Sequence, residues 1–188
     1  QANYQAAARD FRMYLELTKN KQSQEYGLAL YGLGYAGFQQ KNYSQALGWF
    51  NRYVSEAAGG NRQVLADAYN RIGDCYFYVR NFDAARQHYD KAGQVDASLG
   101  DYSLYQEGFV KGLQRDYMGK IQSLNRLITD YPQSSYIDDA LYEQGRAFVM
   151  LEDNANAIGR YQVLLDKFPQ SHMARRAANE IGLLYYQD

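Results

Sequence analysis

The clearest copy of a recurring motif in this chain is Tyr69-Asn70-Arg71-Ile72-Gly73-Asp74-Cys75-Tyr76. Its glycine follows the first tyrosine by four positions, so both residues lie on one face of a helix. The same context recurs around five glycines, at separations of 39, 35, 37 and 37 residues: Gly34, Gly73, Gly108, Gly145 and Gly182. A period of this length predicts an array of helical repeats.

A second pattern follows the polar break after each of the first four glycine helices. It consists of an aromatic residue, a small residue three positions later, an aromatic residue four positions after that, and a final apolar residue. The copies are Tyr43, Ala46, Phe50, Tyr53; Phe82, Ala85, Tyr89, Ala92; Tyr117, Lys120, Leu124, Leu127; and Asn154, Ala157, Tyr161, Leu164. The third copy has a lysine at the small position, and the fourth starts with asparagine. Because two helices approach closely only where neither carries a bulky side chain, the glycines and alanines predict two paired helices per repeat.

The two patterns together predict the organisation of residues 1–188 as a single solenoid segment. They place the second helix of a unit at 1–20, units at about 25–56, 64–94, 100–132 and 136–169, and an unpaired first helix at 171–188. Both ends are expected to be cut edges of a longer array, because terminal repeats need a polar outer face. Residues 57–61 and 97–101 are predicted loops, and Ser134, Ser135 or Ser171 can cap the helices that follow the two prolines.

The glycine motif resembles the first helix of the tetratricopeptide family over nearly the whole chain. The resemblance implies an all-α fold, a right-handed superhelix of antiparallel helix pairs whose first helices line a concave, partner-binding surface. Two junctions, Tyr131-Pro132-Gln133-Ser134 and Phe168-Pro169-Gln170-Ser171, are similar to those in repeats of bacterial cell-envelope proteins. This similarity implies a periplasmic or envelope location, with the cytoplasm as the alternative.

The resemblance also implies which residues contact a partner on the concave face. They are Tyr31, Tyr35, Phe38, Asn70, Asp74, Phe77, Tyr102, Tyr105, Phe109, Tyr142, Arg146 and Tyr186. Most are aromatic, and a stiff amphipathic ring offers a large contact area at low entropic cost. We therefore predict a non-enzymatic scaffold that binds a protein or peptide. A clamp for acidic chain ends is disfavoured, because a carboxylate would meet Asp74 where it needs a cation.

Three other interpretations remain open at this stage. Aromatic rings also stack on sugars, so the chain could bind a glycan or small ligand, with Asn70, Asp74 and Tyr105 as the first residues to examine. The segment could instead be a spacer or self-association domain of a larger protein. Individual rings could also simply pack against neighbouring helices, since the chain has 20 tyrosines.

Composition argues against several other classes of function. A net charge of −1 gives no single-signed field for nucleic acid, and the apolar runs are too short for insertion into a membrane. Cys75 has no cysteine partner and is predicted to be a small packed residue, while His88 and His172 fall in different repeats. We expect no catalytic residues, no cofactor and no metal. The oligomeric state stays open.

Overall fold

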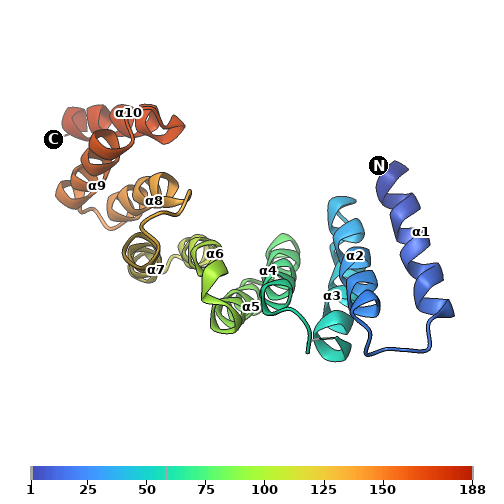
Figure 1. The fold of residues 1–188 in the computed structure, drawn as a ribbon. Coiled ribbons are helices and arrows are strands. Elements are labelled where there is room, and N and C mark those ends of the chain that lie inside the picture. The colour runs from blue at the N-terminus through green and yellow to red at the C-terminus, as the bar shows by residue number, and fades with distance from the viewer. Residues whose placement is uncertain (1, 58, 188) are drawn as a thin grey trace. The chain divides into compact units, whose positions relative to one another are not determined.

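The computed structural model describes residues 2–57 and 59–187, which form helices and no strands (Figure 1). The helices in this part of the chain are α1 (Ala2–Leu17), α2 (Gln24–Gln39), α3 (Tyr43–Glu56), α4 (Arg62–Tyr78), α5 (Phe82–Val95), the short 3₁₀ helix η1 (Ala97–Leu99), α6 (Gly100–Leu113), α7 (Tyr117–Asp130), α8 (Ile137–Met150), α9 (Asn154–Lys167) and α10 (His172–Gln187). Residues 1 and 188 of the predicted terminal helices, and residue 58 of the predicted 57–61 loop, lie outside the described residues. The all-α prediction is confirmed.

The chain divides into two compact units, residues 1–103 and 104–188. In the first unit, α2 packs against α3 and α4 against α5, while α1 lies on α2 and α3 on α4. In the second unit, α8 packs against α9, α7 lies on α8, and α10 contacts both α8 and α9. Each of these helices therefore touches mainly its neighbours along the chain, which is the contact pattern of a repeat array.

The motif glycines leave room for a side chain from the second helix of the same pair. A Cβ built at Gly34 would lie 2.6 Å from the ring of Phe50, and one at Gly73 would lie 2.6 Å from the ring of Tyr89. The two helices of a pair thus pack together at these glycines, but the prediction that neither helix carries a bulky side chain there is wrong, because the second helix contributes a ring. At Gly182, by contrast, no described atom lies within 4 Å of such a Cβ.

The turns inside the helix pairs share one backbone geometry, which the two sequence patterns do not predict. Each contains a non-glycine residue with φ between 59° and 64°: Lys41, Arg80, Arg115 and Glu152. In the first turn, the Lys41 N–H donates to the Phe38 carbonyl and the Asn42 N–H donates to the Gly37 carbonyl, both at 2.9 Å. These bonds satisfy the last carbonyls of one helix, and Asn42 then caps the next helix. In the sequence, each of these turns is marked by a charged residue followed by Asn or Asp.

Residues 97–101 are not the loop that the sequence predicts. They form η1 and the first turn of α6, because the Asp96 side chain accepts from the Ser98 N–H at 2.9 Å and starts a helical turn. At the proline junctions, Ser171 Oγ accepts from the Met173 N–H at 3.0 Å and caps α10. Ser134 Oγ instead accepts from the N–H of Tyr136, the residue before α8, at 3.1 Å.

Candidate functional site

Arg71 of α4 is the centre of a charged cluster in the first unit. Its Nη1 lies 2.6 Å from Asp74 Oδ2, and its Nε lies 3.6 Å from Asp67 Oδ1. Its guanidinium carbon is also 4.9 Å from the ring centre of Tyr102 and 5.9 Å from that of Phe38. Two carboxylates and two aromatic faces therefore orient this cation.

Asn70 and Asp74, predicted for the concave face of α4, are only 1% and 5% exposed. Asp74 Oδ1 accepts hydrogen bonds from the hydroxyls of Tyr89 at 2.8 Å and Tyr102 at 2.9 Å, and Asn70 Oδ1 accepts from Ser103 Oγ at 3.0 Å. Burial raises the pKa of the Asp74 carboxyl, although the neighbouring cation and the two hydroxyls oppose this effect. Asn70 and Asp74 thus pack inside the unit, and the proposed binding face does not include them.

The aromatic residues predicted on α2 keep part of their surface exposed. The Tyr31 hydroxyl donates to Asp67, and the rings of Tyr31 and Tyr35 lie 5.3 Å apart. Burial and then Asp67 raise the pKa of the Tyr31 hydroxyl, so this phenol stays protonated at neutral pH. Tyr31, Tyr35 and Phe38 are all half-buried, and each has one side packed against the core of the unit.

In the second unit, two of the predicted tyrosines contribute to packing. Tyr142 is 2% exposed, and the Arg176 guanidinium carbon lies 4.6 Å from the centre of its ring. The ring of Tyr105 stacks on Tyr136, with centres 5.4 Å apart and planes at 20°, and it packs against the core cluster of this unit. Tyr186, in contrast, is 90% exposed.

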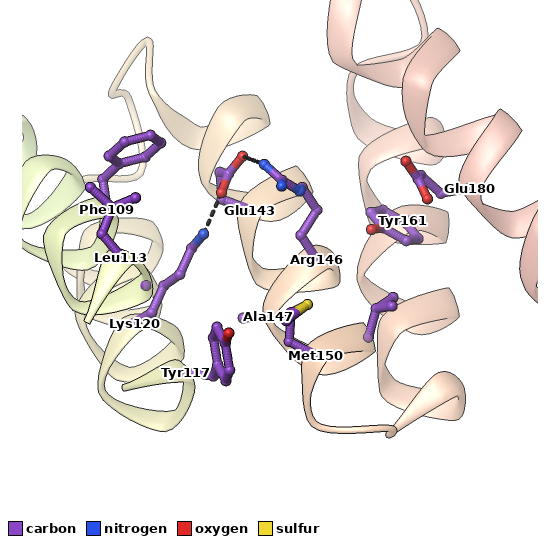
Figure 2. A pocket seen from close by; sticks show the side chains of 12 residues that line it. Phe109, Leu113, Tyr117, Lys120, Glu143, Arg146, Ala147, Met150, Tyr161 and Glu180 are labelled. Atoms are coloured by element: carbon purple, nitrogen blue, oxygen red, sulfur yellow. Dashed lines mark hydrogen bonds and ion pairs between the residues drawn. The ribbon is translucent and has the colours of Figure 1, made fainter. Parts of the chain in front are cut away.

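A pocket of about 310 Å³ brings Phe109 and Arg146, two further predicted site residues, into one site within the second unit (Figure 2). Lys120 and Glu143 form a buried ion pair in its wall, and Arg146 Nη1 lies 3.1 Å from the other oxygen of Glu143. The Lys120 ammonium lies 5.8 Å from the ring centre of Phe109. Lys120, which replaces the small residue of the pattern in the third repeat, is therefore paired with Glu143 and lines this pocket.

Models of the tetratricopeptide repeat match residues 1–61, 102–134 and 139–171, which together make up more than half of the chain. The chain belongs to the tetratricopeptide repeat (TPR) family. A search of curated protein sequences finds no match.

Several solved structures share the TPR fold of this chain. MamA of Desulfovibrio magneticus RS-1 has a TM-score of 0.73 at 14% identity, covering 90% of this chain and 88% of that one. YrrB, a TPR protein with an unusual peptide-binding site, has a TM-score of 0.72 at 17% identity, covering 95% and 84%. BtubC of P. vanneervenii has a TM-score of 0.76 at 12% identity, covering 98% and 81%. The predicted fold class, a TPR solenoid, is confirmed.

An aromatic cluster lies at the end of the first helices in this TPR chain. Tyr78 is 53% exposed and stacks on Tyr43, with ring centres 4.4 Å apart and planes at 7°. Phe38 contacts both rings, at 5.5 and 6.0 Å, and Phe77 lies 5.6 Å from Tyr78. Phe38 and Phe77 are predicted contact residues, whereas Tyr43 and Tyr78 are not, and the sequence signal for Tyr43 is its place at the start of the second-helix pattern.

Other chemistry finds little support in the described part of the chain. No group of three or more His, Cys, Asp or Glu side chains there could hold a metal ion. None of the helices described combines the length and apolar character that crossing a membrane requires. Cys75 is fully buried, and burial raises the pKa of its thiol to about 12, so it suits packing and not nucleophilic attack.

Proposed function

We propose that this TPR chain is a non-enzymatic scaffold that binds a protein or peptide through the aromatic, concave face of its first helices. The observation that carries the proposal is the set of partly exposed rings on two neighbouring first helices, α2 and α4, of the first unit: Tyr31, Tyr35, Phe38, Phe77 and Tyr78. Clusters of exposed aromatic side chains tend to mark surfaces that bind a partner, because aromatic residues are enriched at protein interfaces.

The family membership supports this proposal, and so does the peptide-binding site of the structurally similar YrrB. The glycan alternative loses its main polar candidates, because Asn70 and Asp74 are buried and hydrogen-bonded inside the first unit. A pure spacer has no use for a partly exposed aromatic face. The proposed envelope location rests on the Pro132 and Pro169 junctions alone.

The test is to pan a displayed random-peptide library against the folded chain. We expect enriched peptides whose affinity falls at least about tenfold in the double variant Tyr35→Gln/Tyr78→Gln, because each residue is a contact ring of the kind found at interface hot spots. Tyr185→Gln is the matched control, because Tyr185 is 67% exposed and is not among the predicted contact residues. Failure to enrich any peptide would favour the spacer interpretation.

A further inference from the structure

The pocket of the second unit has one apolar side and one polar side (Figure 2). Leu113, Tyr117 and Met150 contribute to the apolar side, and Leu113 and Met150 are 50% and 58% exposed, so this side opens to solvent. A volume of about 310 Å³ is at the small end of the range for ligand sites. It accommodates one large side chain of a partner and a neighbouring polar group.

The Tyr161 hydroxyl is a buried polar group at this pocket without a hydrogen-bond partner among the described residues. The residue is fully buried, and a Cβ at Gly145 would lie 2.6 Å from its Cζ, so the ring cannot swing toward α8. Figure 2 shows the hydroxyl at the end of the ring that faces the helix of Glu143 and Arg146. Burial, followed by Glu180, raises the pKa of this hydroxyl, so it is a proton donor at neutral pH. A buried donor of this kind is unfavourable unless an acceptor reaches it.

The other polar groups of the pocket also offer more donors than acceptors. Both oxygens of Glu143 are engaged, one by Lys120 and one by Arg146. An ammonium has three N–H groups and a guanidinium five, so both cations keep donors beyond these bonds. Glu180, which already accepts from the Tyr142 hydroxyl at 3.3 Å, is the acidic lining residue that opposes an anion. The formal charges of the lining cancel, but the exposed Arg146 guanidinium and the Tyr161 hydroxyl are donors that a ligand acceptor can reach from the pocket, and a carboxylate forms the strongest bonds with such a cation.

We propose that this pocket binds an acidic side chain of a partner peptide together with an adjoining large apolar side chain. The carboxylate accepts from the Tyr161 hydroxyl and from Arg146 at the half-exposed edge of the ion-pair cluster, while the apolar side chain packs against Leu113 and Met150. This inference rests on the proposed function, that the chain binds peptides, and specifies the ligand chemistry of the second unit alone.

The experiment uses the peptides enriched by panning against the whole chain. We expect them to carry Asp or Glu next to Leu, Ile, Met or Phe. Tyr161→Phe removes only the unpartnered hydroxyl, so it should keep the melting temperature and weaken these peptides about tenfold, the size of one hydrogen bond to a charged group. Arg146→Gln should weaken them as well, whereas Arg160→Gln, a charge change outside the pocket lining, should not.

A Glu→Gln change in the peptide tests the pairing directly. It should weaken binding to the wild type and have a clearly smaller effect on Tyr161→Phe, since the two groups act on each other. Peptides that are sensitive to Tyr35→Gln/Tyr78→Gln but indifferent to Tyr161→Phe and Arg146→Gln would overturn this inference and leave the proposed function standing. In that case the Tyr161 hydroxyl binds only water. If no peptide is enriched, both proposals fall.

Discussion

The contact between Gly73 and Tyr89 sets a sharp limit on the size of residue 73. A methyl group there would lie 2.6 Å from Cε1 and 2.8 Å from Cδ1 of the ring. Tyr89 has little freedom to move, because it is 1% exposed and its hydroxyl is bonded to Asp74 at 2.8 Å. Overpacking a core costs about 1–3 kcal/mol, while replacing glycine by alanine within a helix gains about 0.5–1 kcal/mol. We therefore expect Gly73→Ala to lower the free energy of unfolding by up to about 2.5 kcal/mol.

Two other glycines provide the matched controls. Gly159 in α9 and Gly182 in α10 have no described atom within 4 Å of an added Cβ. Gly159→Ala should therefore raise the free energy of unfolding by about 0.5–1 kcal/mol, and Gly182→Ala, near a helix end, by less. The assay is urea unfolding followed by far-UV circular dichroism on the wild type and the three variants. If Gly73→Ala is as stable as Gly159→Ala, the packing argument for the motif glycines is refuted.

Three side chains outside the proposed binding face give further measurable expectations. The buried Cys75 thiol, with its pKa raised to about 12, should react with iodoacetamide at neutral pH far more slowly in the folded chain than in urea, and equal rates would contradict the packing. Burial, more than Lys91, lowers the pKa of His88 below its ordinary 6.5, so the unfolded chain binds more protons and stability should fall as pH drops below 6.5. The loss of stability below pH 6.5 should be smaller in His88→Gln. An unchanged dependence of stability on pH in this variant would contradict the role given to His88. Lys41→Gly relieves a φ of 60° and should add about 0.5–1 kcal/mol of stability by the same urea assay, after the added flexibility of the unfolded chain is deducted. A loss of stability would show that this turn is not strained.

The sequence by itself determined the repeat, its all-α character and the positions of four glycines at which the two helices of a unit pack together, Gly34, Gly73, Gly108 and Gly145. These features depend on periods and residue sizes within one repeat, as in Gly34 with Phe50 and Gly73 with Tyr89. The register also predicted which residues lie on the partner-facing side of the first helices. It could not tell which of them a neighbour covers, because register specifies the face of a helix and not the side chains packed against that face.

Only the tertiary structure decided the burial of Asp74 and the composition of the second-unit pocket. Asp74 is buried because Tyr89 and Tyr102, on two other helices, both donate to it. Lys120 was visible in the sequence as a departure from the small position, but its partner Glu143 lies 23 residues away in the next repeat. The cost of burying a charge or a hydroxyl depends on partners brought together by packing, and no period in the sequence records that geometry.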